Sequence, residues 1–458
     1  MVTDAAAETP KPIPYVQETR FLGSQLFYNR DRLRLYSRIV AECGPVGGFH
    51  FGPFPIILFN APEYVQSILV EHANDFEKGR LLRNTFRPVV GNGIFTSEGE
   101  FHRRQRKLMA PSFQPRQVAS YAECMVHYGE RIQRGWRDGA VIDINRQMTA
   151  ITLSIIGKTL FDADVFSETD ELVKALTTII RYIAHQLSAF IILPLDWPTP
   201  RNLRTKQAIQ VIRTRIQRMI DERRNSGDNE RNDFLSLLLR ARDEEGKQMD
   251  DEQVRDESVT LFRAGHETTA AALTWAWYLL ATHPAIYRRM QQEIDAVLQG
   301  RTPTYADLAS LPYSLQVFKE AMRLYPPVAA FSRVAMRDVT VGEYLVQKGE
   351  TVFLVPYTLH RTPAYFPHPE QFDPERFTPE QEQRLPRNAY IPFGEGARIC
   401  IGKHFALLEG HLLLVTLAQR VSFELLPGQK IRPDLRKTTA LRPAGSIKMI
   451  VRRRDMTK

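Results

Sequence analysis

Apolar residues recur at three- and four-residue spacing along most of the chain after His102, and this period predicts a mainly helical body. We expect helices over about residues 115–136, 143–161, 167–190, 203–224, 250–282, 284–298, 312–324 and 401–420. Pro284 and the pair Pro326-Pro327 mark helix boundaries, because proline disrupts a helix when it lies inside it. The charged, turn-rich stretch 222–233 predicts an exposed loop between two helices.

Segments with the character of β-strands are few and short. Residues 49–60 (FHFGPFPIILFN) are rich in aromatic and β-branched residues around glycine and proline, which predicts a β-hairpin. A helix is expected over residues 62–72, and further strands over residues 339–341 and 351–356. The pattern as a whole indicates a mainly α fold with small β-sheets.

The chain shows no internal repeat and no linker between autonomous parts. We therefore expect one domain over residues 1–458, with a flexible segment at about 1–14, β-rich portions near 45–60 and 330–360, and a helical body elsewhere. Residues 1–14 contain no apolar run, and the chain has no stretch of about twenty apolar residues, so neither a signal peptide nor a membrane anchor is expected.

The net charge of +9 and the pI of about 9.4 allow two interpretations. Nucleic-acid binding is disfavoured, because the basic residues are not interleaved with aromatic ones and no nucleic-acid-binding module is visible. A basic surface that attracts an acidic protein partner fits the same charge. Three widely separated cysteines, Cys43, Cys124 and Cys400, argue against a disulfide framework and a zinc site, and favour a reducing, cytoplasmic setting.

The segment FGEGARICIG, residues 393–402, places Cys400 in a glycine-rich loop just before a predicted helix. Glycines permit tight backbone angles and close approach, and the free N–H groups at a helix start favour a thiolate. A core cysteine beside a glycine turn is the plain alternative. The pattern FxxGxxxCxG, however, resembles the haem-binding loop of the cytochrome P450 family. The resemblance implies a P450 fold in which Phe393, Cys400 and Gly402 contact haem b, with Cys400 as the ligand of the iron.

The segment AGHETTA, residues 264–270, lies in the long predicted helix and is similar to the oxygen-activation segment of the same family. The Thr268 hydroxyl can bond the carbonyl of Ala264 one turn back, which would open a polar notch in an apolar wall. The resemblance implies that Thr268 holds dioxygen and a water and that Glu267 relays protons. A zinc-protease HExxH motif is excluded, because Ala270 stands where the second histidine is needed. Taken alone, the segment would also fit an amphipathic core helix with incidental polar residues.

Glu320 and Arg323 in KEAMRLYPP (residues 319–327) lie one helical turn apart and can form an ion pair. Such pairs are a weak signal alone, because exposed ones are abundant. Their place before a Pro-Pro stop and ahead of PERF (residues 374–377) resembles a structural network of the family. The resemblance implies that Arg376 joins Glu320 and Arg323, with a role in folding and haem insertion.

Further basic side chains match positions that reach the haem propionates in the family. In HRRQRKL (residues 102–108), His102 stands where many members have tryptophan, and Arg106 is in register. Arg333 and Arg398 match two more such positions, and a guanidinium suits bidentate binding of a carboxylate. The basic stretch 102–108 is equally compatible with a solvated helix face.

By the same resemblance, an apolar pocket for the substrate would be lined by Phe95, Ala264, Thr268, Val328, Ala329, Phe331 and the segment 187–192. Plain core packing is the alternative for each apolar residue. The implied substrate is a hydrophobic small molecule such as a fatty acid, terpenoid or steroid. The segment PVGGFHFG carries only His50 and no arginine, which weakens the case for an anchored fatty-acid carboxylate.

The implied activity is that of a monomeric monooxygenase, which uses O2 and two electrons to hydroxylate or epoxidise this substrate. No flavin or iron–sulfur module is visible, so we expect the electrons from an acidic ferredoxin or flavodoxin with its reductase. Basic residues expected to attract this partner are Arg103, Arg104, Lys107 and Lys403. A peroxide-dependent or rearranging enzyme of the same fold is a rival that Thr268 and Glu267 disfavour, because such chemistry needs no proton relay. A haem-based gas sensor is a second rival, and no signalling domain supports it.

Overall fold

The structure, a computed structural model, describes residues 10–16, 28–162, 169–187, 189, 193–225, 231–436 and 438–454. The chain divides into two compact units. The smaller unit comprises Met1–Arg80, Ala330–Pro369 and Leu385–Ile399, and the larger comprises Leu81–Ala329, Glu370–Arg384 and Cys400–Lys458. Within the described ranges, no helix combines the length and the apolar character needed to cross a membrane.

The smaller unit is built on a five-stranded sheet of order β1-β2-β8-β5-β3. Its strands are β1 (Val46–Phe51), β2 (Phe54–Phe59), β8 (Thr351–Leu354), β5 (Phe331–Ala335) and β3 (Phe76–Glu77). The predicted hairpin is confirmed, because β1 and β2 pair antiparallel from Val46–Phe59 to Phe51–Phe54. Alternate residues of β2 enter different hydrophobic clusters, Ile57 and Phe59 one cluster, and Ile56 and Leu58 the other. The sheet is therefore covered on both faces, which is why β2 is apolar without interruption.

Short helices cover the two faces of this sheet. α2 (Arg32–Cys43) packs on one face, and α3 (Pro62–Gln66) followed by a π-helical turn (Ser67–Glu71) packs on the other. The predicted helix over residues 62–72 is thus present, with a change of helix type inside it. A separate hairpin joins β6 (Val339–Val341) to β7 (Tyr344–Val346), and α15 (Pro356–Leu359) follows β8. The predicted strand 351–356 ends early, since Pro356 starts α15.

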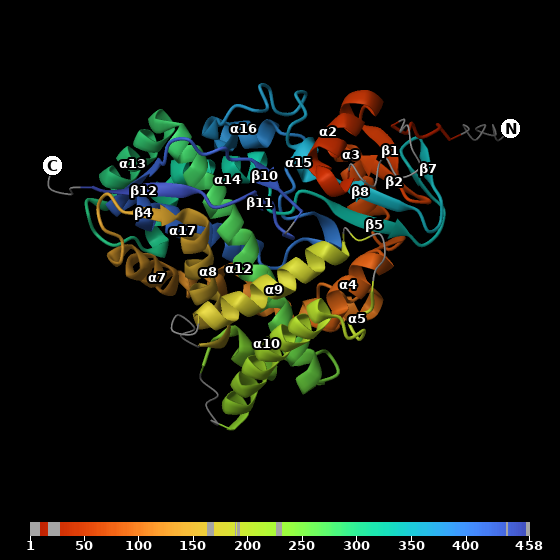
Figure 1. Ribbon diagram of the computed structural model, residues 1–458, viewed down its shortest axis with the longest axis horizontal. Helices are drawn as coiled ribbons and strands as arrows, with labels where there is room; N and C mark the ends of the chain where they lie inside the picture. Colours follow the sequence, from red (N-terminus) through yellow and green to blue (C-terminus); the bar gives the residue numbers. More distant parts are fainter. Residues whose placement is uncertain are drawn as a thin grey trace. The chain divides into compact units, whose positions relative to one another are not determined.

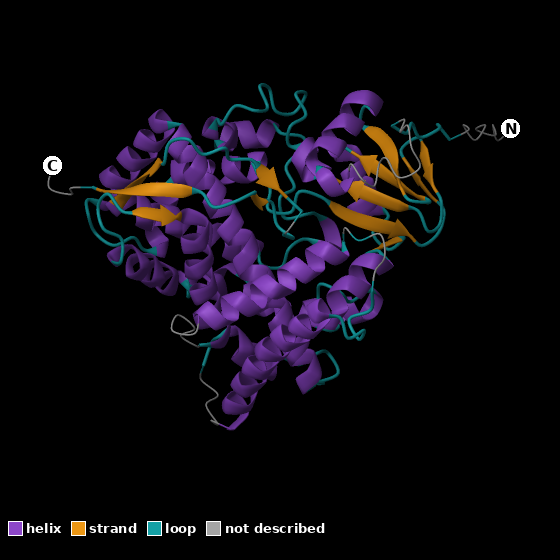
Figure 2. Cartoon of the chain, in the orientation of Figure 1, coloured by secondary structure: helices purple, strands orange, loops and turns teal. Residues whose placement is uncertain are grey.

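Figure 2 shows that helices make up most of the larger unit. They are α4 (Arg80–Val90), α5 (Gly99–Met109), α6 (Pro115–Ala119), α7 (Ala122–Arg134), α8 (Ile144–Phe161), α9 (Thr169–Gln186), α10 (Pro200–Asn225), α11 (Phe234–Arg240), α12 (Asp251–Thr282), α13 (Pro284–Leu298), α14 (Pro312–Leu324), α16 (Pro379–Arg384) and α17 (Lys403–Arg420). A three-stranded sheet of order β4-β12-β9 and a two-stranded sheet accompany them. These strands are β4 (Val141–Asp143), β9 (Val421–Leu425), β10 (Pro433–Asp434), β11 (Arg442–Pro443) and β12 (Lys448–Arg453).

The predicted helices of this unit are largely confirmed. α13 and α14 have the predicted bounds, and α8 and α12 begin one residue late. The prediction of a single helix over residues 115–136 is wrong, because the helix is interrupted between α6 and α7. The loop expected over 222–233 is wrong in its first part, since α10 continues to Asn225, whereas residues 226–230 lie outside the described residues.

α12 is the central element of the larger unit, where it contacts α8, α10, α14 and α17 (Figure 1). A capping box of Asp250 and Gln253 starts the helix, and most of its residues are buried. Gly265 allows α8 to approach, because a Cβ atom there would lie 2.6 Å from the Cδ1 of Ile156. Near its C-terminal end, the indole N–H of Trp275 donates to the carbonyl of Leu441 at 2.8 Å. In a helix buried this extensively, each polar side chain is costly unless it finds a hydrogen-bond partner.

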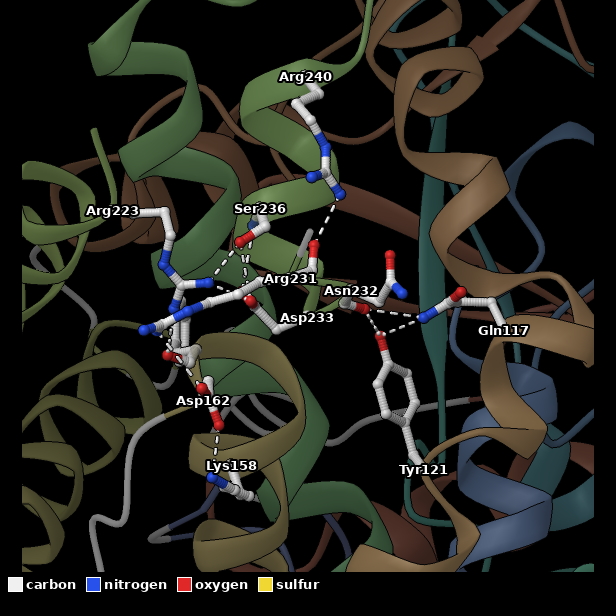
Figure 3. A network of polar contacts seen from close by, with 11 residues as sticks. Gln117, Tyr121, Lys158, Asp162, Arg223, Arg231, Asn232, Asp233, Ser236 and Arg240 are labelled. Carbon is white, nitrogen blue, oxygen red and sulfur yellow. Dashed lines mark hydrogen bonds and ion pairs between the residues drawn. The ribbon is translucent and has the colours of Figure 1, made fainter. Parts of the chain in front are cut away.

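The turn that leads into α11 is held by the polar network of Figure 3. Asp233 caps α11 by accepting from the Ser236 amide at 3.1 Å, and Arg223 of α10 donates to both of these side chains. On the other side of the turn, the Tyr121 hydroxyl donates to the carbonyl of Asn232 at 3.3 Å. The network ties α10, α11 and the start of α7 together.

Candidate active site

The AGHETT segment lies in the middle of α12. The Thr268 hydroxyl donates to the carbonyl of Ala264 at 3.1 Å, and the Thr269 hydroxyl donates to the carbonyl of Gly265 at 3.3 Å. The hydrogen bond expected for Thr268 is therefore present. The helix nevertheless continues without interruption from Asp251 to Thr282, so this bond does not break it.

Glu267 is buried, with 2% of its surface exposed. Its Oε2 accepts from the Thr439 hydroxyl at 2.7 Å and lies 3.8 Å from Nη2 of Arg263. Burial alone would raise the pKa of Glu267, but the guanidinium groups of Arg442 and Arg263 and the Thr439 hydroxyl together bring it below its ordinary value. Glu267 is therefore a buried anion at neutral pH.

Glu409 on α17 is a second buried acid near this segment, and sequence reasoning missed it. Its carboxyl is fully buried, and burial raises its pKa well above the ordinary value. The Thr269 hydroxyl offsets this rise in part, but its own hydrogen bond goes to Gly265. Among the described residues neither oxygen of Glu409 has a partner in hydrogen-bond geometry, so the group is a neutral acid. An acid inside the apolar run FALLEGHLLLV was the signal available in the sequence.

Cys400 lies at the start of α17, whose N-cap is Gly402. The residue keeps solvent-accessible surface, yet protein atoms crowd around the thiol and raise its pKa. The Gly402 amide, which donates to the sulfur, and the Arg106 guanidinium lower that pKa in part. The expected groups that favour a thiolate are therefore present, but burial outweighs them. Binding of a cation to the sulfur would make up this difference.

The rest of the cysteine loop belongs to the smaller unit, where Phe393 is half-buried. Gly394 and Gly396 have φ values of 72° and 70°, which favour glycine. A Cβ atom on Gly396 would also come within 2.1 Å of the carbonyl oxygen of Leu69. Arg398 ends a 3₁₀ turn (Gly396–Arg398) two residues before Cys400 in the chain.

The other propionate candidates are divided between the two units. His102 and Arg106 lie one turn apart on α5 of the larger unit, the first buried and the second half-buried. Burial lowers the pKa of Arg106, and the neighbouring Cys400 partly offsets this effect. Arg333 is buried on β5 of the smaller unit, where its Nη1 donates to the carbonyl of Ser332 at 2.8 Å.

The structure brings Glu320, Arg323 and Arg376 together in the larger unit. Arg323 donates from Nε and Nη2 to the two oxygens of Glu320, at 2.6 and 2.8 Å, and both side chains have no exposed surface. Nε of Arg376 lies 3.5 Å from Oε1 of Glu320, and the Asp373 amide donates to the same oxygen at 2.9 Å. One buried carboxylate thus joins α14 to the segment that carries Arg376.

The sequence profile of the cytochrome P450 family matches residues 10–451 of this chain. This chain belongs to the cytochrome P450 family. Among curated proteins, it is 37% identical to "Cyclooctatin synthase" of Streptomyces melanosporofaciens over 93% of both chains. It is 34% identical to "Cyclooctat-9-en-7-ol 5-monooxygenase" of the same organism, over 93% of this chain and 94% of that protein. It is 33% identical to "Pentalenene oxygenase" of Streptomyces avermitilis, over 94% of each chain.

The chain is therefore a P450 monooxygenase with a haem-iron cofactor, and its cysteine loop fits such a group. Gly402 has φ −86°, so no backbone strain requires glycine at this position. Among the described residues outside its chain neighbours, a Cβ atom there would meet only the Cys400 sulfur within 4 Å, at 3.9 Å. It would project beside the sulfur rather than into packed protein. Together with Arg106 for a carboxylate, these residues have the donor chemistry and the clearance that a haem needs at a thiolate ligand.

The predicted lining residues of this P450 are spread over several elements. Ala264 is half-buried on α12, and Phe95 is half-buried between α4 and α5, with its ring 4.8 Å from that of Phe86. Val328 is exposed, and Ala329, next to it, is buried. Phe331 lies on β5 of the smaller unit. The predicted segment 187–192 falls mainly outside the described residues, since only positions 187 and 189 are described.

Two acids of α12 hold the loop that carries Phe95, and sequence reasoning missed both. Asp256 accepts from the amide of Asn92 at 2.7 Å, and Glu257 accepts from the amide of Ile94 at 2.7 Å. Gly91 has φ 63°, and a Cβ atom on it would overlap the Asp256 carboxyl at about 2 Å. The loop is therefore fitted closely to α12.

The basic residues of α5 are only partly available to a partner protein. Arg104 donates to Asp243 at 2.7 Å, and Lys107 pairs with Glu244. Arg103 is exposed and has no ionic partner among the described residues. The expected positive surface is thus smaller than the sequence indicates, because two of its charges are neutralised within the chain.

The network around Glu320 predicts a large loss of stability on breaking it. We expect Glu320→Ala and Arg323→Ala each to lower the free energy of unfolding by roughly 3–5 kcal/mol, because each removes one partner of a buried, hydrogen-bonded ion pair. The double variant should lower the free energy of unfolding by less than the sum of the two single effects. Urea unfolding followed by circular dichroism measures these free energies. Arg452→Ala is the control, since its 2.9 Å pair with Glu424 is about half exposed and should contribute under about 1 kcal/mol. Equal effects at both pairs would contradict the prediction.

The neutral state of Glu409 predicts a pH dependence of stability. Above its ordinary pKa of 4.5, Glu409 is ionised in the unfolded chain but protonated in the folded one, so stability falls as pH rises. Glu409→Gln removes this titration. Its stability relative to the parent should therefore grow between pH 5 and pH 8, by up to about 1.4 kcal/mol per pH unit. Thermal unfolding across this range is the measurement, with Glu380→Gln at an exposed position of α16 as the control. Parallel curves for parent and Glu409→Gln would contradict it.

Proposed function

We propose that this P450 hydroxylates a terpenoid, with haem b bound through Cys400 and electrons supplied by an acidic ferredoxin or flavodoxin. The observation that carries this proposal is the placement of Cys400, a residue with solvent-accessible surface, beside Gly402 and Arg106. Haem, when bound, supplies reductive activation of O2 and insertion of one oxygen atom into a C–H bond. None of the three cysteines lies in a CxxCH motif, which supports haem b held without covalent attachment.

The side chains of α12 would handle the protons. The Thr268 hydroxyl donates to Ala264, which leaves its oxygen free to accept a hydrogen bond from a water. Glu267 is ionised, and within the described residues its Oε1 has no hydrogen-bond partner. A carboxylate with a low pKa takes up a proton only briefly and returns it readily. We therefore assign proton transfer to Glu267 and the positioning of water to Thr268.

The terpenoid class is chosen from the fatty acids, terpenoids and steroids that the sequence leaves open. Two Streptomyces relatives are named for oxidation of pentalenene and of cyclooctat-9-en-7-ol, and each aligns over more than nine-tenths of both chains. The same extent of similarity supports one P450 domain over residues 1–458, because the family profile spans both units.

A carbon monoxide difference spectrum of the reduced, haem-loaded protein tests the proposal. We expect the thiolate-shifted Soret band in the parent and its loss in Cys400→Ser, because serine cannot supply the thiolate. Cys124→Ser is the matched control, since Cys124 lies on α7 and burial raises its pKa to about 12. A shifted band that persists in Cys400→Ser would overturn the assignment. Turnover that needs no external electrons would instead indicate the rearranging class.

Charge reversal tests the acidic redox partner. Arg103→Glu combined with Lys403→Glu should raise the apparent KM for a ferredoxin or flavodoxin several-fold at low salt, because it reverses exposed and half-exposed positive charges. The effect should shrink as ionic strength rises. Arg288→Glu, at an exposed position of α13, is the control. A KM that is unchanged, or changed equally by the control, would contradict this partner surface.

A further inference from the structure

Arg263 is a buried cation on the wall of an apolar cavity. It lies on α12, five residues before Thr268, and 7% of its surface is exposed. The cavity lies among α4, α9, α10 and α12. Its other lining residues are all apolar: Val89, Leu176, Ile179, Ile209, Ile212 and Val259. Among the described residues that line this cavity, Arg263 is therefore the polar one.

The guanidinium of Arg263 is only partly satisfied. Its Nη2 donates to the Thr439 hydroxyl at 2.9 Å, and Glu267 lies 3.8 Å away. One face of the guanidinium lies over the ring of Phe86, with 4.7 Å from Cζ to the centroid. The buried Nε has no acceptor among the described residues. A buried donor without an acceptor is costly, so an acceptor atom supplied by a ligand would stabilise this N–H.

The ion pair with Glu267 does not by itself explain why Arg263 is buried here. Glu267 already accepts from Thr439, and Arg442 has the largest effect among the groups that lower its pKa. Two guanidinium groups thus face one carboxylate, which leaves a net positive charge beside an apolar cavity. Burial lowers the pKa of Arg263, but an arginine remains protonated in proteins. Such a site favours an electron-rich oxygen over a purely hydrocarbon ligand.

We propose that Nε of Arg263 donates a hydrogen bond to an oxygen of the substrate, so that this P450 oxidises a terpenoid that already carries oxygen. This inference rests on the proposed function and names its substrate class more closely. Five residues of helix separate Arg263 from Thr268 by about 7.5 Å along the axis. The oxidised carbon should therefore lie several bonds away from the oxygen that Arg263 binds. An earlier oxygenation or hydration of a terpene hydrocarbon must supply such a substrate.

Binding of a matched ligand series tests this proposal. Limonene, perillyl alcohol and perillic acid share a ring skeleton and differ in carrying no oxygen, a hydroxyl or a carboxylate. Spectral titration of the haem-loaded protein gives each dissociation constant without turnover. We expect the parent to bind an oxygenated member about tenfold or more tightly than limonene, the scale of a hydrogen bond from a charged donor. Preference for the acid over the alcohol would identify a carboxylate as the acceptor.

Three variants assign that preference to Arg263. Arg263→Met removes the donor at similar length, and we expect the preference to fall to near unity. Arg263→Lys keeps a cation beside Glu267 but lacks Nε, so its preference should fall several-fold even if the methionine variant fails to fold. Val259→Ala is the control on the same cavity wall and should change the affinities for all three ligands by a similar factor.

The outcomes separate this inference from the proposed function. A parent protein without the thiolate-shifted band would overturn the proposed function, and this inference with it. A parent with that band and no preference for an oxygenated ligand would overturn the role of Arg263 alone. An undiminished preference for the oxygenated ligand in Arg263→Lys, or in a haem-loaded Arg263→Met, would also overturn the role of Arg263.

Discussion

The burial of α12 is the constraint on which the larger unit depends. A helix packed on nearly every side has little solvent to satisfy its polar side chains, so they depend on partners within the protein, several of them from other elements. Asp256 and Glu257 accept from the loop before α5, and Glu267 accepts from Thr439 near the C-terminus. The same polar groups that would destabilise an isolated apolar helix therefore connect α12 to segments far away in the chain, and they supply the chemistry of the site.

Three buried carboxyls show how their surroundings decide their charge. Glu320 accepts two hydrogen bonds from Arg323 and one from a backbone amide, so it serves as a structural counter-ion. Glu267 is an anion, because two guanidinium groups outweigh the effect of burial. Glu409 has only a nearby hydroxyl to offset burial and stays neutral. Glutamate thus serves as a structural counter-ion, as a proposed proton carrier and as a buried neutral acid. Its role depends on which cations lie near its carboxyl.

Local patterns explain which elements were predictable. Proline sets the first residues of α13 and α14, and aromatic and β-branched residues around Gly52 set the β1–β2 hairpin. The loop over residues 222–233 was misjudged at Glu222–Asn225, because charged residues also suit the exposed end of a helix such as α10. The break between α6 and α7 was missed because the apolar spacing continues across it.

The sequence by itself determined the family motifs, the order of the main helices and the contacts between near neighbours. Thr268 bonds Ala264, and Glu320 meets Arg323, at spacings that any helix brings together. Only the tertiary structure decided the surroundings of Arg263, Glu267 and Glu409, because several of the groups around them lie far away in the chain. Thr439 is 172 residues from Glu267, and Thr269 and Glu409 come from different helices. Motif spacing records which side chains share one helix, whereas burial and net charge depend on what packs against that helix.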